Sequence, residues 1–468
     1  MYVHSGSVPQ EGTDAVRAGA SRLIGSGGAP GRSVELETAL DAAPVGRFLL
    51  GMLALCACVA LLDGFDTLAI TYVAPVIAKA WQLPKEAFGP IFAAHYVGAA
   101  AGAAIFGILA DRWGRRPAIV WSTAVFAAFA LATPLAQDFG SLFVLRALTG
   151  VGLGGALSNV IALVSEFAPA RSRATMVSVL YAAFPLGGVF GGPLSAYLLE
   201  HHSWQAVFVV GGLLPLALLP LLIRYLPESV RFLLTRNPHD SQVARQMSKL
   251  DALAGYTSSD IFTAPRQADS RRTPISKVFG PGLLMSSVLL GAAAFATQIL
   301  IVYIITWMPT LLQATGIPLS HAILTSAAFS LGGIAGSLLL AATIDKRRSY
   351  APLVATFLAA ALAIAAIGFA PGDRMVLTTV VALAGGLIVG AQVNLSSYSA
   401  TVYPTEVRAT GVGWVVGIGR VGAIAGALVG SLFLALNLSL AWQYVLVGSV
   451  SLVIALLVQL ARSSKEAN

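Results

Sequence analysis

The chain of 468 residues is poor in charged residues and in cysteine. Charged residues make up 11% of it, whereas an average soluble protein has about 25%. Its two cysteines, Cys56 and Cys58, lie one residue apart in an apolar run, so they form neither a disulfide framework nor a metal cage. The sequence also has no grouping of histidines, cysteines and carboxylates of the kind that catalytic or metal sites need. These absences argue against an enzyme and predict neither a metal nor a cofactor.

Apolar residues are abundant. They make up 57% of the chain, and the mean hydropathy is +0.80. Apolar runs of at least about 18 residues recur along the sequence, which predicts an all-α protein that crosses the lipid bilayer many times. The twelve expected spans are residues 48–79, 88–110, 117–136, 141–167, 174–199, 204–226, 282–312, 320–343, 350–370, 373–402, 407–435 and 440–461.

Lysines and arginines predict the orientation in the membrane. If the N-terminus is cytoplasmic, 24 of the 29 basic residues fall in cytoplasmic segments and three in outer segments. The remaining two, Arg146 and Arg420, fall within spans. This bias satisfies the positive-inside rule and predicts that both termini are cytoplasmic. It also accounts for the net charge of +8, so we expect no nucleic-acid partner.

The spans divide the chain into five parts. The N-terminal residues are rich in Gly, Ser and Ala and lack the regions of a signal peptide, so we expect a disordered tail there. The parts are a disordered cytoplasmic tail (1–46), an N-terminal six-helix bundle (47–226), a cytoplasmic linker loop (227–281), a C-terminal six-helix bundle (282–461) and a cytoplasmic tail (462–468).

The two bundles repeat one another. Residues 169–175 match residues 404–410 at an offset of 235, with Pro, Arg, Ala and Thr identical. Asp111 and Asp345 match at an offset of 234. Two matches at nearly the same offset predict duplicated halves with parallel topology, which place a substrate site near the midplane at their interface.

Two acids, Asp63 and Asp66, lie inside the first apolar run. One Asp at the centre of a membrane helix costs roughly 2.5–3.5 kcal/mol on translocon scales. The spacing of three residues places both acids on one helix face. We therefore interpret them as residues that handle ions or protons. The alternative is a role in helix packing or as a hinge, with Gly64 allowing a close approach.

The loop after the second span resembles a known family motif. Residues 107–116 read Gly-Ile-Leu-Ala-Asp-Arg-Trp-Gly-Arg-Arg, so an acid at a helix end stands among three arginines. This order is similar to the loop motif of the major facilitator superfamily, and the resemblance implies that fold over all twelve spans. It also implies a conformational latch, although an orientation signal is the simpler reading. The candidate latch residues are Gly107, Asp111, Arg112, Gly114, Arg115, Arg116, Asp345 and Arg408.

Four further stretches narrow the resemblance. Residues 63–66 (Asp-Gly-Phe-Asp), 146–155, 226–233 and 403–411 together resemble the aromatic acid:proton symporter family, although sugar porters share the motif at 226–233. The resemblance implies proton coupling by the two acids of the first stretch. Two departures stand out: the second-half loop lacks the Gly expected after Asp345, and Ser158 stands where Pro is expected. The first weakens any latch there, and the second leaves the substrate within the family open.

Arg420 is the main candidate for binding an anion. It lies about 13 residues into its span, at a depth similar to that of Asp63, roughly 20 Å from the inner end of the first span. A midplane Arg must face a cavity or an acid, and its guanidinium binds a carboxylate bidentately. The alternative is an ion pair with an Asp that only holds helices together. Arg146 either pairs with one of the two acids or attracts the anion.

An aromatic acid also needs a flat apolar slot with a few polar groups. Each candidate could have a structural role instead of binding substrate, since single aromatic residues usually pack and Trp often anchors a helix at the membrane interface. His95, the only histidine well inside a span, either titrates or is a hydrogen-bonded structural residue. The further candidates for substrate binding are His95, Tyr303, Trp307, Gln392, Asn394 and Trp414.

We therefore expect a secondary active transporter that imports a small aromatic carboxylate, such as benzoate or a hydroxybenzoate, with protons by alternating access. It would act as a monomer in the inner membrane of a bacterium and use no cofactor besides the proton gradient. A sugar porter or another organic-anion porter of the same superfamily is the alternative within transporters. A transport-dead membrane sensor or receptor is the alternative from another class.

Overall fold

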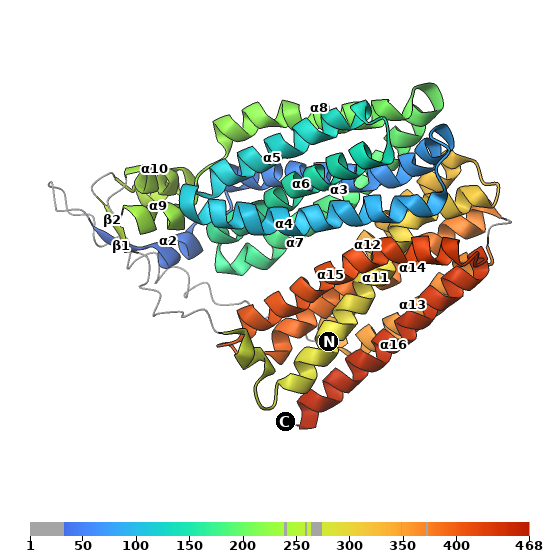
Figure 1. The fold of residues 1–468 in the computed structure, drawn as a ribbon. Helices are drawn as coiled ribbons and strands as arrows, with labels where there is room; N and C mark the ends of the chain where they lie inside the picture. Colours follow the sequence, from blue (N-terminus) through green and yellow to red (C-terminus); the bar gives the residue numbers. More distant parts are fainter. Residues whose placement is uncertain are drawn as a thin grey trace, which may run out of the picture.

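The structure is a computed structural model that describes residues 32–237, 241–257, 260–263, 274–347, 349–370 and 373–467. Within these ranges each of the twelve expected spans corresponds to one helix (Figure 1). The helices of the N-terminal half are α3 (Arg47–Ala80), α4 (Phe88–Trp113), α5 (Arg115–Ala132), α6 (Phe139–Phe167), α7 (Ala170–His201) and α8 (Trp204–Tyr225). Those of the C-terminal half are α11 (Leu284–Ala314), α12 (Leu319–Arg347), α13 (Ala351–Ile367), α14 (Arg374–Val402), α15 (Arg408–Ala435) and α16 (Leu440–Ala467).

The predicted class, an all-α membrane protein of two six-helix halves, is confirmed. Eleven of the described helices are long and apolar enough to cross a membrane. The twelfth, α13, has 17 residues and rises about 26 Å, slightly less than the roughly 30 Å hydrocarbon core. The apolar composition explains the helices, because only hydrogen bonds within the segment satisfy a backbone surrounded by lipid.

Glycines set the closest helix contacts in both halves, and they follow the predicted repeat. A Cβ on Gly98 of α4 would lie 2.0 Å from a carbonyl oxygen of α6, and one on Gly332 of α12 would lie 1.9 Å from a carbonyl oxygen of α14. Gly187 of α7 meets α3 in the same way, and Gly422 of α15 meets α11. The members of each pair are 234 or 235 residues apart, so both halves use the same small-residue packing.

The two halves touch near one end and separate toward the other (Figure 1). We call the end that carries α9 (Val230–Arg236) and α10 (Ser241–Leu250) the linker face. Contacts between the halves lie toward the opposite face, where Ser431 of α15 donates a hydrogen bond to the Glu86 carbonyl oxygen. Nearby, the ring of Phe92 on α4 meets the ring of Trp307 on α11 edge-on, with 5.3 Å between centroids. In this arrangement the helices of the two halves diverge toward the linker face.

Part of the N-terminal tail is folded, so the prediction of a disordered tail is wrong for residues 33–42. Strand β1 (Ser33–Glu35) pairs in parallel with β2 (Ile261–Thr263), and α2 (Leu36–Ala42) follows it. The apolar residues of α2 are buried in a cluster that includes Met247 of α10 and Phe262 of β2, more than 200 residues away in sequence, which local composition does not reveal. Residues 1–31 lie outside the described ranges.

The linker is likewise more structured than a loop. Besides α9, α10 and β2, the described residues form four short 3₁₀ helices, of which two lie in the linker. The four are η1 (Lys85–Ala87), η2 (Thr133–Leu135), η3 (Ala252–Ala254) and η4 (Ile275–Phe279).

Candidate functional site

Asp66 and Arg146 form a buried ion pair at the centre of the N-terminal half. Arg146 Nη1 lies 3.0 Å from Asp66 Oδ2, and both side chains are fully buried. Arg146 Nη2 donates to Thr133 Oγ1 at 2.6 Å and to Thr149 Oγ1 at 2.9 Å. The guanidinium also lies over the Phe208 ring, 4.8 Å from its centroid. Arg146 therefore ties α3, η2, α6 and α8 together, which favours the ion-pair interpretation of this residue.

The fold of α6 places Arg146 at this depth. The helix begins after Asp138, whose carboxylate accepts the backbone N–H of Ser141 at 2.7 Å, while the Ser141 side chain closes the capping box. Arg146 follows about two turns later. Gly211 of α8 allows close packing against α3, since a Cβ there would lie 2.9 Å from the Phe65 ring, beside Asp66.

Asp63 has a different environment from Asp66. Its side chain is buried, but its hydrogen-bond partner is neutral: Thr67 Oγ1, one turn later on α3, lies 3.3 Å from Asp63 Oδ1. The same Thr67 oxygen lies 3.2 Å from His95 Nε2 on α4. In the described part of the chain, no cation lies within ion-pairing distance of Asp63. The predicted pair of acids is thus one salt-bridged carboxyl and one held only by a hydroxyl group.

Gly64 shows that residues 63–66 also have the alternative role predicted for them, which is helix packing. A Cβ on Gly64 would lie 1.8 Å from the carbonyl oxygen of Phe184 on α7. Only glycine allows α3 and α7 to approach this closely. Close helix packing and the placement of the two acids therefore occur on the same turn of α3.

Arg420 lies on the face of α15 that meets the N-terminal half. Positions 420, 427 and 431 are spaced by seven and four residues and share one helix face. Ala427 and Ser431 lie against Gly89 of α4 near the face opposite the linker. Arg420 is two turns closer to the linker face, where the halves have separated, and its side chain is exposed. Within the described ranges it forms no ion pair and no hydrogen bond, so the ion pair with an Asp does not form in this structure.

The aromatic candidates are mostly buried in the C-terminal half. Tyr303 donates to Gln443 Oε1 at 2.8 Å. Trp307 donates to the Ala427 carbonyl oxygen at 3.0 Å, and its ring reaches α4 of the other half. Trp414 is half-buried near the linker face and donates to the Ser287 carbonyl oxygen at 3.0 Å. Of these three, only Trp307 lies at the interface between the halves.

The two amide candidates take different positions. Asn394 donates to the carbonyl oxygens of Ser337 and Gly390, so it joins α14 to α12. Gln392 donates to the side chain of Gln298 on α11, which the sequence interpretation did not single out. Gln298 packs against Gly419, the residue before Arg420. The signal for Gln298 was an amide within an apolar run, the same signal that pointed to Gln392.

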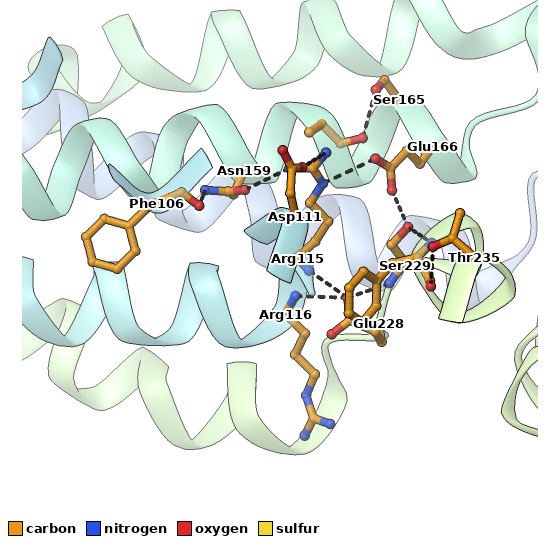
Figure 2. A network of polar contacts seen from close by, with 12 residues as sticks. Phe106, Asp111, Arg115, Arg116, Asn159, Ser165, Glu166, Glu228, Ser229 and Thr235 are labelled. Atoms are coloured by element: carbon orange, nitrogen blue, oxygen red, sulfur yellow. Dashed lines mark hydrogen bonds and ion pairs between the residues drawn. The ribbon is translucent and has the colours of Figure 1, made fainter. Parts of the chain in front are cut away.

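The latch candidates of the first half form a polar network at the linker face, drawn in Figure 2. Arg115 lies 3.5 Å from Asp111 and 3.3 Å from Glu166 on α6. Glu228, in the segment between α8 and α9, accepts the backbone N–H groups of Arg115 at 2.7 Å, Arg116 at 3.2 Å and Ser229 at 2.8 Å. Burial raises the pKa of the Glu228 carboxyl, and these N–H donors oppose that shift.

Gly114 is required where this network turns. Its φ is +107°, and a Cβ there would lie 2.2 Å from a carboxylate oxygen of Glu228. A Cβ on Gly107 of α4, which is partly exposed, would meet nothing within 4 Å. Arg112 is exposed. Glu166 and Ser229, which also bond to each other, were not candidates, although Ser229 belongs to the 226–233 motif.

The second half has no equivalent network in the described residues. Asp345 is exposed and forms no ion pair there. Arg408 donates to the Tyr403 carbonyl oxygen and to Thr405 Oγ1 at 3.4 and 3.5 Å, both within its own segment. The missing Gly after Asp345 agrees with this asymmetry, because the first-half turn depends on Gly114.

Two similar six-helix halves with buried charges between their helices are an arrangement that many membrane transport proteins have. The profile described as Major Facilitator Superfamily matches residues 55–427, and the chain belongs to this superfamily. Solved structures agree on the fold. A D-xylose–proton symporter has a TM-score of 0.68 at 18% identity, covering 87% of this chain and 97% of that one. A partially occluded, inward-open structure of the xylose transporter XylE from E. coli has a TM-score of 0.69 at 16% identity, covering 88% and 97%.

Characterised relatives support the narrower resemblance. The chain is 35% identical to a gallate transporter of Pseudomonas putida over 89% of its own length and 92% of that protein. It is 33% identical to the 4-hydroxybenzoate transporter PcaK of Pseudomonas putida, over 87% and 91%. It is 36% identical to a 3-(3-hydroxy-phenyl)propionate transporter of Escherichia coli, over 82% and 86%. The resemblance to aromatic acid transporters of this superfamily is thereby confirmed.

Proposed function

We propose that the protein imports a small aromatic carboxylate together with protons by alternating access. The substrate class is supported by the relatives, which are named for gallate, 4-hydroxybenzoate and hydroxyphenylpropionate. The proposed substrate site lies at the interface of the halves. The proposed location of the protein is the cytoplasmic membrane of a bacterium. The linker face and both termini are cytoplasmic in this proposal, which the bias of basic residues supports.

Arg420 is the observation that carries the proposal. An exposed Arg without an acidic partner in the described chain is costly near the middle of a membrane unless it binds an anion or faces water. A planar guanidinium fits a planar carboxylate through two parallel hydrogen bonds. Sugars lack a charge for it to pair with, which makes a sugar porter the weaker candidate. We assign no cofactor besides the proton gradient.

The proposed cycle assigns separate tasks to the two halves. The anion binds Arg420 in the C-terminal half, and a proton neutralises Asp63 in the N-terminal half. Neutralisation removes the cost of a buried, unpaired carboxylate and allows the loaded protein to rock between its two faces. The buried Asp66–Arg146 pair keeps the N-terminal half rigid during this motion.

Uptake into proteoliposomes tests the proposal. Radiolabelled 4-hydroxybenzoate should accumulate when the outside is more acidic, and a protonophore should abolish the accumulation. Unlabelled gallate and benzoate should compete, whereas xylose should not. Accumulation of xylose, or specific binding without any flux, would instead favour the sugar porter or the transport-dead sensor.

A further inference from the structure

The two acids of α3 have unequal access to a proton. Arg146 neutralises Asp66 in a pair whose side chains are both completely buried. Asp63 lies one turn closer to the linker face, and its only described hydrogen-bond partner is the Thr67 hydroxyl group. A carboxyl group without a cation gains more from protonation than one in a salt bridge. Asp63 is therefore the acid to which a proton has to be delivered.

Thr67 links Asp63 to His95 in one short chain of polar atoms. The Thr67 oxygen lies 3.3 Å from Asp63 Oδ1 and 3.2 Å from His95 Nε2. A hydroxyl group donates one hydrogen bond and accepts two, so Thr67 can donate to one neighbour while it accepts from the other. All three side chains are buried, so bulk water does not compete with these contacts.

The other nitrogen of His95 is the open end of this chain. His95 Nδ1 is buried and has no hydrogen-bond partner in the described part of the molecule. The His95 side chain is 3% exposed, and an unpartnered ring nitrogen at such a site is costly. A nitrogen placed in this way is available to a proton donor when the halves rearrange.

We propose that His95 and Thr67 form a proton relay that loads Asp63. A proton binds His95 Nδ1, the Nε2 proton moves to the Thr67 oxygen, and the Thr67 hydroxyl proton moves to Asp63 Oδ1. One N–H bond and one O–H bond break, while one N–H bond and two O–H bonds form with the added proton. Afterwards Asp63 is neutral, Thr67 is again a hydroxyl group, and His95 is neutral in its other tautomer. The incoming proton neutralises the charge of Asp63.

The charges around the relay favour delivery to Asp63. Asp66 and Arg146 are the neighbouring ions, and because they neutralise each other they compete little for the proton. On α4 the next residue, Tyr96, contacts the His95 ring edge-on at 5.5 Å. The middle parts of α7, α8 and α11, residues 174–199, 205–223 and 285–313, contain no charged residue. Their titratable side chains are Tyr181, Tyr197 and Tyr303.

The test removes one hydroxyl group, which should interrupt the relay without disturbing the fold. Thr67→Val should reduce proton-driven accumulation to the level seen with a protonophore. Exchange of labelled for unlabelled substrate, which needs no net proton release, should continue. Thr67→Ser restores the hydroxyl group and should restore accumulation. His95→Gln should reproduce Thr67→Val, and the double variant should be no worse than either single variant, since both changes interrupt one path.

Thr71→Val is the matched control. Thr71 is a buried threonine one turn further along α3, and its hydroxyl group donates to the Leu68 carbonyl oxygen of its own helix. This variant should keep wild-type accumulation, and melting temperatures should show that all variants fold. Wild-type accumulation by Thr67→Val or by His95→Gln would overturn the relay.

The relay rests on the proposed proton-coupled function, and the two fail in different ways. If the wild-type protein exchanges aromatic acids but never responds to a proton gradient, the proposed coupling is wrong. If the wild-type protein is coupled and Thr67→Val is equally coupled, only the relay is wrong. Equal loss of exchange and accumulation in a folded Thr67→Val would assign Thr67 to substrate binding and would also overturn the relay.

Discussion

At the scale of single residues, the two acids of α3 differ in what surrounds them, although their spacing alone makes them look equivalent. Asp66 is part of a salt bridge that joins four elements, and Asp63 faces a threonine. A buried ion pair that loses one member leaves the other charge uncompensated, whereas neutralising a lone acid removes a cost. We therefore expect substitutions of Asp66 and of Asp63 to affect stability differently.

Asp66→Asn should destabilise the protein, because Arg146 then remains as a buried charge without a counterion. The expected loss is roughly 3–5 kcal/mol, measured as a lower melting temperature in detergent. Asp63→Asn should leave the melting temperature unchanged or raise it while it abolishes proton-driven uptake. Similar melting temperatures for the two variants would contradict this division of roles.

Arg420 is expected to act through its geometry as well as its charge. Arg420→Lys keeps the charge but loses the planar fork, so it should raise the apparent KM for an aromatic acid by about tenfold, with a smaller effect on the maximal rate. Arg420→Ala should abolish carboxylate uptake. Measuring binding of 4-hydroxybenzoate to each purified variant checks this, and wild-type affinity in Arg420→Ala would rule out Arg420 as the anchor.

At the scale of elements, the turn between α4 and α5 is the point where the polar network at the linker face depends on one residue. The positive φ of Gly114 and the nearby Glu228 carboxylate both exclude a side chain. Glu228 in turn fixes the start of α5 through two backbone N–H groups. The network therefore joins the ends of four helices rather than one pair.

Gly114→Ala should lower stability and slow transport while it leaves substrate affinity nearly unchanged, because the turn is far from Arg420. A non-glycine residue in this conformation costs of order 1–3 kcal/mol before the clash with Glu228 is added. Gly107→Ala, on the same loop motif but in open space, is the matched control and should behave as wild type. Melting temperatures and initial uptake rates of both variants decide the outcome, and equal values would contradict it.

The folded N-terminal segment should stabilise the linker. Leu36 and Leu40 of α2 are buried in the same cluster as Met247 of α10 and Phe262 of β2. Removing residues 1–40 should therefore speed amide hydrogen exchange in α10 and β2, whereas Arg32→Ala should change it little, because its ion pair with Asp260 is partly exposed. Unchanged exchange after the truncation would mean that α10 is stable without β1 and α2.

At the scale of the whole molecule, the two halves meet near the face opposite the linker. A second contact between the halves brings Gly188 on α7 beside Ser330 on α12, at the depth where α7 packs on Gly64 of α3, and a Cβ on Gly188 would lie 3.7 Å from the Ser330 Cβ. This distance suits a disulfide, whose Cβ atoms are about 3.8 Å apart. Alternating access requires this contact to open in every cycle.

Gly188→Cys combined with Ser330→Cys should therefore form a cross-link that stops both uptake and exchange, and a reductant should restore them. The two single variants, each with the native Cys56 and Cys58, are the controls and should stay active under oxidation. Full transport by the cross-linked protein would contradict alternating access through this contact.

The sequence by itself determined the class and the architecture of this protein. Apolar runs long enough to cross a bilayer define helices, because lipid leaves the backbone no other way to satisfy its hydrogen bonds. The repeat seen from residues 169–175 and 404–410 reappears in Gly187 and Gly422, which bring helices together at equivalent places. The motifs also identified the superfamily. These properties depend on composition, period and local order, which a single chain displays directly.

Only the tertiary structure decided which residues work together. Asp63 and Asp66 share a helix face, but other helices surround them differently: His95 of α4 contacts Thr67 beside Asp63, and Arg146 of α6 pairs with Asp66. The fold of residues 33–42 depended on β2, and the pairing of Gln392 depended on Gln298. Such contacts join segments far apart in the chain. Their geometry follows from how whole helices pack, which local sequence patterns do not encode.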